Sequence, residues 1–330
     1  MTLLQGMETK SLFRVFLGLS LFGLVDAAHA ADPAQELAGF SVFPTVDLTQ
    51  LAHSDVKAAH GPPMGNPRFG SVQSVYVAPG TPQQHIAAMN RWNPTGHPEL
   101  RVFVHNEGTN FARLTNVPDN GPVRALATAT TKPSQELQIS REEAKKLPIG
   151  APATFAGPVA NFWIGVLTGR SHSGAGGQPP YDFTGQPIRP GEELRAMAGQ
   201  QPKLQKQFSG ILGSALGGGG SKYWELLQVE DSAVLTMGAS GNHPVSNGAI
   251  QAYDTLYYSS GGYYAGLTLY QLWPVTVEGR PSTLVWRGDM ISSNAFAGLH
   301  GIERVASESQ MMKDISRAIT FFRRDTAGGR

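Results

Sequence analysis

Five short segments between Tyr223 and Ile291 constrain the fold of this chain more than any other feature. Each is rich in β-branched and aromatic residues, and each is separated from the next by a few turn-forming residues, which is typical of consecutive strands. Gly261 and Gly262 can adopt the positive φ angles that a tight hairpin needs, and Glu278-Gly279 precedes the last segment in the same way. The segments are Tyr223–Val229, Ala233–Met237, Ala249–Tyr258, Tyr263–Trp273 and Ser282–Ile291. They predict an antiparallel meander.

An earlier part of the chain predicts a strand, a short helix and a second strand. Phe69–Pro79 alternates between two sets of side chains with the period of a strand. A helix is expected over Pro82–Trp92, because Thr81 can cap it and Gln84 can complete a capping box. Glu99–His105 is apolar at alternate positions and predicts the next strand.

The carboxy-terminal segment predicts one long amphipathic helix. Its apolar residues recur at steps of three and four, and charged residues are assigned to the opposite side. The apolar set is Leu299, Ile302, Val305, Met312, Ile315, Ile319 and Phe322, and the charged set is Glu303, Arg304, Glu308, Lys313 and Arg317. A helix of this kind can cover one face of the sheet. The predicted fold class is therefore α+β, with a curved antiparallel sheet packed against a long C-terminal helix.

The middle of the chain predicts an insertion into a single domain. The sequence contains 39 glycines and 23 prolines, and many of them cluster between Gly169 and Gly191 and again over Gly217–Gly220. The stretch between these clusters is helical in pattern but too short to hold a core of its own. We therefore expect one domain over residues 31–330, with a helical, Gly/Pro-rich insertion at about 169–220.

Residues 1–30 have the pattern of a signal peptide. Lys10 and Arg14 form a basic region, Val15–Val25 is apolar, and Ala28-His29-Ala30 fits a cleavage site, so the mature chain is expected to begin at Ala31. The apolar run is shorter than the roughly 20 residues that cross a bilayer. The sequence thus predicts an exported protein of the bacterial periplasm or the extracellular space.

The composition excludes several classes of function. The chain has no cysteine, which rules out disulfides and thiolate metal sites. Its formal net charge is +1 and only 15% of its residues are charged, so a nucleic acid partner lacks the basic surface it would need. No cofactor and no metal are predicted.

The Tyr-rich hairpin indicates a sheet that is packed or lined on both faces. Alternation places Tyr264, Gly266, Thr268, Tyr270 and Leu272 on one face, and Tyr263, Ala265, Leu267, Leu269, Gln271 and Trp273 on the other. On the next strand Arg287 and Asp289 share a face and can pair. Buried tyrosines need partners for their hydroxyl groups, which a cavity with a few polar groups would supply.

The order of these elements resembles the helix-grip fold of START-like and Bet v 1-like lipid-binding proteins. The resemblance is carried by VYVAPGTPQQHIAAMNRW, YYAGLTLYQLWPV, TLVWRGDMI and LHGIERVASESQMMKDISRAITFF. It implies a hollow between the sheet and the last helix that holds an apolar or lipid-like small molecule. A filled core is the alternative reading. The expected ligand-binding residues are Tyr258, Tyr264, Tyr270, Trp273, Trp286, Arg287, Asp289 and Met312.

No complete catalytic motif stands out, so a noncatalytic protein is favoured over an enzyme. His85, His97 and His105 match no zinc-binding spacing and are interpreted as surface or capping residues. Two other functions stay open. One is a periplasmic hydrolase with acid–base residues from Asp254, Asp289, His243 and His300, and the other is an envelope assembly protein that uses the insertion to hold a partner. A peripheral membrane contact is a further possible partner interaction.

Overall fold

An eight-stranded antiparallel sheet, with strand order β1-β2-β8-β7-β6-β5-β4-β3, organises the fold. The structure, a computed structural model, describes residues 32–53, 56–133 and 137–327. The predicted signal peptide lies outside these residues. The strands are β1 (Lys57–His60), β2 (Phe69–Pro79), β3 (Val102–Glu107), β4 (Ser221–Val229), β5 (Ser232–Pro244), β6 (Ile250–Ser259), β7 (Ala265–Val277) and β8 (Arg280–Ser292).

The meander predicted from the sequence is present as β4 to β8, with each strand paired to the next in the chain. Glu278 and Gly279 join β7 to β8 with φ angles of 50° and 73°, the conformation that a two-residue hairpin favours. The chain's early strand β2 then pairs with its last strand, so that Val72 lies opposite Asp289. This long-range pairing joins the first part of the chain to the meander in one sheet.

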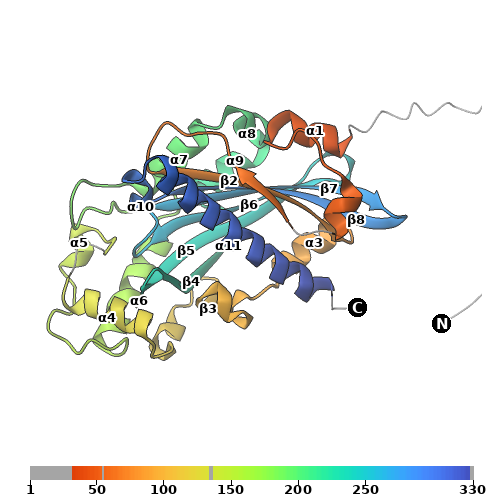
Figure 1. The fold of residues 1–330 in the computed structure, drawn as a ribbon. Coiled ribbons are helices and arrows are strands. Elements are labelled where there is room, and N and C mark those ends of the chain that lie inside the picture. Colours follow the sequence, from red (N-terminus) through yellow and green to blue (C-terminus); the bar gives the residue numbers. More distant parts are fainter. Residues whose placement is uncertain (1–31, 54–55, 134–136, 328–330) are drawn as a thin grey trace, which may run out of the picture. The chain divides into compact units, whose positions relative to one another are not determined.

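One face of the sheet is covered by the long helix α11 (Gly301–Ala327) and the short helix α3 (Pro82–Met89), and we call it the α11 face. Figure 1 shows α11 crossing the strands obliquely. The capping box at Thr81 and Gln84 is formed as predicted, and it starts α3 at Pro82. A small buried cluster joins these helices to the sheet. Its members are Tyr76, Ala78, Ile86, Ile250, Ala252, Tyr270, Leu272, Val285 and Ile319.

Only the C-terminal half of α11 uses its apolar stripe against the sheet. Ile319 and Phe322 are buried, whereas Ile302 is 88% exposed and Val305 is 54% exposed. Arg304 faces inward instead and donates hydrogen bonds to the carbonyl oxygens of Pro67 and Phe69. The assignment of Ile302 and Val305 to the sheet-facing stripe, and of Arg304 to the outer side, was therefore wrong.

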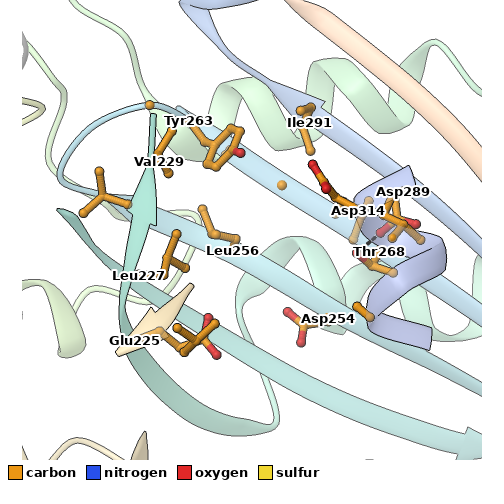
Figure 2. A pocket seen from close by; sticks show the side chains of 18 of the residues that line it. Glu225, Leu227, Val229, Asp254, Leu256, Tyr263, Thr268, Asp289, Ile291 and Asp314 are labelled. Atoms are coloured by element: carbon orange, nitrogen blue, oxygen red, sulfur yellow. Dashed lines mark hydrogen bonds between the residues drawn. The ribbon is translucent and has the colours of Figure 1, made fainter. Parts of the chain in front are cut away.

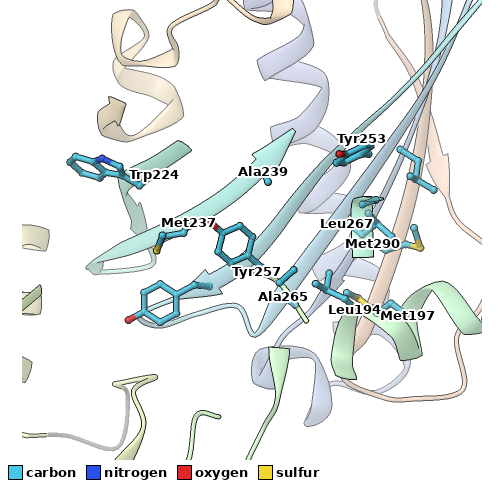
Figure 3. Close-up of a cluster of buried hydrophobic side chains, with 14 of the residues drawn as sticks. Leu194, Met197, Trp224, Met237, Ala239, Tyr253, Tyr257, Ala265, Leu267 and Met290 are labelled. Atoms are coloured by element: carbon cyan, nitrogen blue, oxygen red, sulfur yellow. The ribbon is translucent and has the colours of Figure 1, made fainter. Parts of the chain in front are cut away.

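The other face of the sheet is covered by α1 (Pro33–Phe40), α7 (Pro190–Gly199), α8 (Pro202–Gln207) and α9 (Ser209–Gly217), and we call it the α7–α9 face. The main core lies here. Figure 3 shows part of it, with Leu194 and Met197 of α7 near Leu267 and Met290 of the sheet. Three of the four covering helices lie within residues 169–220, so the segment predicted as an insertion supplies a whole layer of the fold.

The remaining elements complete this second layer or connect strands. They are α2 (Leu48–His53), α4 (Gly121–Thr131), α5 (Arg141–Ala144), α6 (Pro158–Ser171), α10 (Asn294–Ala297), and the 3₁₀ helices Pro94–Gly96, Pro98–Leu100, Ala112–Asn116 and Ser246–Gly248. The α+β class, the antiparallel sheet and the C-terminal helix are confirmed, but the sheet is open and uncurled where a curved one was expected. Within the described ranges, no helix has the length and apolar character that crossing a bilayer requires.

Candidate ligand-binding cavity

A cavity of about 1760 Å³, partly open to solvent, is lined by the α11 face of the sheet and by α11, and also by α3, β3, Leu126 and Tyr181. Typical small-molecule sites have volumes of roughly 300–1,000 Å³, so this space exceeds what a small metabolite needs. Figure 2 shows side chains that point into it from the strands and from α11. Apolar walls come from Leu227, Val229, Leu256, Tyr263, Ile291 and Ile315.

Gly266 leaves one position of the sheet without a side chain beneath the helix. Gly266 lies opposite both Leu256 on β6 and Ile291 on β8. A Cβ atom built on Gly266 would meet its nearest neighbour, the Cβ of Leu256, at 3.5 Å, which is an ordinary contact. A larger side chain at position 266 would therefore extend into the cavity without a backbone clash.

Gly238 has a different role, because it seats an aromatic ring. It pairs with Tyr223 on β4, and a Cβ atom at Gly238 would lie 2.2 Å from Cζ of Tyr223. The Tyr223 ring therefore lies directly against the backbone of β5. This position brings the Tyr223 hydroxyl to Asp254 on β6, to which it donates a hydrogen bond of 2.6 Å.

Polar side chains form a second row, two residues along each strand from the row that contains Gly266. Asp254, Thr268 and Asp289 lie opposite one another on β6, β7 and β8. The Thr268 hydroxyl donates to Oδ1 of Asp289 at 2.9 Å, the contact drawn as a dashed line in Figure 2. We call Tyr223, Asp254, Thr268, Asp289 and Arg287 the polar row. It crosses the floor of an otherwise largely apolar cavity.

Within the polar row, Asp289 carries a charge that is already balanced. Arg287 donates to it through Nε at 2.8 Å and through Nη2 at 2.7 Å, and Asp289 is only 4% exposed. The Arg287 guanidinium also lies 5.5 Å from the ring centre of Tyr270, within the range of a cation–π contact. Burial opposes the charge of Arg287, but Asp289 and Tyr270 outweigh it and raise the pKa of the guanidinium.

Of the two carboxylates in the polar row, Asp254 has fewer hydrogen-bonding and charged partners than Asp289. Burial raises its pKa from 3.8 to about 6, and the hydrogen bond from Tyr223 opposes that rise only in part. Its side chain is half-buried because the cavity reaches it. Near neutral pH a small change in surroundings therefore shifts Asp254 between its charged and neutral forms.

One histidine, His105, lines the cavity, and another, His85, is buried in α3 outside its lining. His105 of β3 pairs with Glu225 of β4 at 2.8 Å, and this hydrogen bond raises the pKa of His105. His85 of α3 is buried against Tyr76, whose hydroxyl lies 3.0 Å from His85 Nε2. Burial lowers the pKa of His85 to about 4, so its ring is neutral at physiological pH. His97, the third histidine of the group, pairs with Asp325 at 2.7 Å.

The structure brings four of the eight predicted ligand-binding residues to the cavity: Tyr264, Tyr270, Arg287 and Asp289. The predicted pairing of Arg287 with Asp289 is confirmed. Met312 of α11 is not among the residues that line the space. Whether any of the eight binds a ligand stays a prediction.

The other three predicted residues belong to the α7–α9 face. Trp286 packs on Phe40 with ring centres 4.9 Å apart, and Trp273 donates to Glu36 at 2.9 Å. Tyr258 lies under Arg170, whose guanidinium carbon is 4.3 Å from the ring centre. These three aromatic side chains, which the sequence suggested as ligand-binding residues, pack in the main core.

Sequence reasoning missed Tyr223 and Leu256 altogether, and it placed Asp254 only in a hydrolase. The sequence did contain a signal for Asp254 and Leu256. Together with Ala252 they occupy every second position of a predicted strand, so their side chains share one face. Of the proposed hydrolase residues, Asp254 and Asp289 line the cavity, but the exposed His243 and His300 do not. In the part of the chain that the structure describes, no cluster of side chains could hold a metal ion.

Comparisons with known proteins place the chain in no family. No protein-family model matches it, and no curated protein does. A similar solved structure is that of Ara h 8.0201, a Bet v 1-family protein, at 12% identity over 33% of this chain and 69% of that chain. The TM-score is 0.22, which is too low to support an argument about shared fold or ligand.

Proposed function

We propose that this protein binds an apolar or lipid-like small molecule between the sheet and α11, without catalysing a reaction. The observation that carries the proposal is the cavity of about 1760 Å³ beneath α11, with apolar walls and a polar row on its floor. Ligand sites commonly combine such walls with a few convergent polar groups. In this proposal the C-terminal helix holds the ligand against the sheet, as the resemblance to helix-grip proteins implies.

The cavity's two kinds of lining have separate roles in the proposal. Leu256, Gly266 and Ile291 contact the apolar body of the ligand, and the polar row fixes its orientation. α11 is held near both ends, by the hydrogen bonds from Arg304 to the carbonyl oxygens of Pro67 and Phe69 and by the burial of Ile319 and Phe322, so in this proposal the ligand lies beneath a helix that stays in place. The export expected from residues 1–30 would place this binding in the periplasm or outside the cell.

Binding of a neutral apolar dye tests the proposal. N-phenyl-1-naphthylamine fluoresces strongly in apolar surroundings, and we expect the purified protein to enhance its fluorescence in a saturable way. Gly266→Leu should reduce this binding at least tenfold, because the new side chain enters the cavity. Gly165→Leu, the same change on the exposed side of α6, should leave dye binding unaltered. Equal dye binding by both variants, or none by the unaltered protein, would show that the cavity is not the site.

Acid–base catalysis is a second candidate function, favoured by one observation. Asp254 has a pKa of about 6, faces a cavity, and lies across Thr268 from a second carboxylate, Asp289. A general acid or base works best with a pKa near the operating pH. Hydrolysis of p-nitrophenyl esters of two to twelve carbons tests this candidate. It requires turnover that Asp254→Asn abolishes, and it fails if the variant and the unaltered protein give the same rate.

A further inference from the structure

We propose that the ligand is an amphiphile with a protonated amine, and that Asp254 is the residue that holds the amine. This inference rests on the proposed function, since it names the class of molecule that the same cavity takes. It follows from three features of the cavity: its charge balance, its supply of hydrogen-bond donors, and the position of its apolar walls.

The first feature is that Asp254 has no cationic partner among the described residues, unlike its acidic neighbours. Asp289 is held by Arg287 at 2.7 Å, and Glu225 by His105 at 2.8 Å. Asp254 accepts only the phenol hydrogen bond from Tyr223. A carboxylate in a cavity is costly unless a cation pairs with it, so the site is completed by a cation from outside the chain.

The acidic residue of α11 that lines the cavity, Asp314, also has hydrogen-bonding and charged partners. Asp314 contacts Arg317 at 3.3 Å and accepts from Gln310 at 3.1 Å, all on the same helix. The charged groups that surround Asp254 are thus Glu225 and His105 on one side, Arg287 and Asp289 on the other, and Asp314 above. Those groups pair among themselves or with neighbours on their own helix, whereas Asp254 has no ion-pair partner among the described residues.

The second feature is that two of the hydroxyl donors next to Asp254, those of Tyr223 and Thr268, are already used. The Tyr223 hydroxyl gives its proton to Oδ1 of Asp254, and the Thr268 hydroxyl gives its proton to Asp289. The second oxygen of Asp254 accepts no hydrogen bond from a described residue, and the Tyr223 phenol keeps its lone pairs as acceptors. A ligand group that donates hydrogen bonds suits these acceptors, and an ammonium group donates three.

The third feature is that apolar wall begins directly beside Asp254. Leu256 is two residues away on the same strand and face, and Gly266 and Ile291 continue its row across β7 and β8. Leu227, Val229 and Tyr263 extend this wall away from Asp254 toward the β6–β7 turn, as Figure 2 shows. The alkyl or aromatic body of a ligand whose ammonium group lies at Asp254 would thus lie along Leu256, Gly266 and Ile291.

Three amphiphiles with the same ten-carbon chain test the inference: decylamine, decanol and decanoate, each displacing N-phenyl-1-naphthylamine at pH 7.5. We expect decylamine to bind at least tenfold more tightly than decanol, and decanoate to bind more weakly than decanol. Asp254→Asn should remove the tenfold advantage of decylamine and leave decanol unchanged. Asp119→Asn, which alters an exposed carboxylate that is not part of the cavity lining, is the matched control and should keep the advantage.

The outcomes separate this inference from the proposed function. If the three compounds displace the dye equally, or if decylamine keeps its advantage in Asp254→Asn, the amine is not held by Asp254 although the cavity still binds. If the dye itself does not bind, the proposed function fails as well. Tyr223→Phe provides a second variant should Asp254→Asn not fold. Loss of the Tyr223 hydrogen bond raises the pKa of Asp254, so decylamine binding should weaken at a higher pH than in the unaltered protein; an unchanged pH profile contradicts the inference.

Discussion

Arg287 and Asp289 lie two positions apart on β8, so both side chains point to the α11 face, where they form a two-point ion pair of 2.7 and 2.8 Å. Side chains two positions apart on one strand normally lie side by side on the same face without forming a two-point ion pair. Here Thr268 donates a further hydrogen bond to Asp289 and keeps the carboxylate turned toward Arg287. The floor of the cavity thus contains a neutral pair beside the unpaired Asp254.

Removing the negative partner of this pair should change which ligands the cavity accepts. In Asp289→Asn the Arg287 charge is left unpaired, so we expect decanoate to bind about tenfold more tightly than in the unaltered protein. The free energy of unfolding should fall by about 3 kcal/mol, because one charge of a largely buried pair loses its partner. Dye displacement and urea unfolding measure the two effects. An unchanged affinity for decanoate would mean that Arg287 is not accessible from the cavity.

The raised pKa of Asp254 predicts a penalty on stability at neutral pH. Its pKa is about 6 in the folded state and 3.8 as the model value for the unfolded chain, so the folded state binds the extra proton between these values. The penalty is complete above pH 6, amounts to about 3 kcal/mol, and is relieved as the pH falls toward 4. We therefore expect Asp254→Asn to be more stable than the unaltered protein at pH 7.5 by up to that amount, and by only about 1 kcal/mol at pH 4.5. Urea unfolding at the two pH values measures the difference; a constant difference contradicts the assignment.

His85 should have the opposite dependence on pH. Its pKa is about 4 in the folded state against 6.5 as the model value, so the unfolded chain takes up the proton first as the pH falls. Stability is unaffected above pH 6.5 and is lost progressively from there to pH 4, by about 3 kcal/mol in total. His85→Gln, which can still hydrogen-bond to Tyr76, should lose about 3 kcal/mol less than the unaltered protein between pH 7.5 and 4.5. Equal losses in the two proteins would show that His85 is not held neutral.

Arg170 is expected to be the most sensitive charged residue of the α7–α9 face. It is fully buried, donates to Glu143 at 2.8 and 2.6 Å, and covers the ring of Tyr258. Arg170→Met keeps much of the volume but leaves Glu143 without its partner, and should cost about 3–5 kcal/mol. Arg124→Met breaks an exposed pair with Asp119 and should cost less than about 1 kcal/mol. Chemical unfolding distinguishes them, and similar costs would mean that the buried pair contributes no more than a surface one.

The parts of the fold that follow a strict period could be predicted from the sequence. Alternation in β7 assigns Thr268 and Tyr270 to one face, alternation in β8 assigns Arg287 and Asp289 to one face, and all four line the cavity. The bounds of β2 match the predicted segment, and the capping box sets the start of α3. In each of these cases a local rule of backbone geometry is sufficient.

The layer formed by α7 to α9 could not be predicted, because its helices are short and interrupted by glycine and proline. The sequence of α9, SGILGSALG, has apolar residues on most sides, so no stripe shows which side faces the sheet. The same layer buries Leu194, Met197 and Phe208 in the main core, which weakens the idea that this segment reaches out to hold a partner. The shape of the cavity also lay beyond the sequence, because it depends on cross-strand register that brings Gly266 under α11.

The pairing of β2 with β8 has a consequence for how the chain reaches its folded state. Val72 and Asp289 are neighbours in the sheet, yet the ribosome makes more than two hundred residues between them. Contacts at such sequence distances close slowly, because a long loop must lose its freedom before they form. Until β8 is synthesised, β2 cannot pair with the meander, and the nascent chain cannot complete the sheet. Such a delay would keep the chain unfolded for translocation across a membrane, the export route that we propose for it.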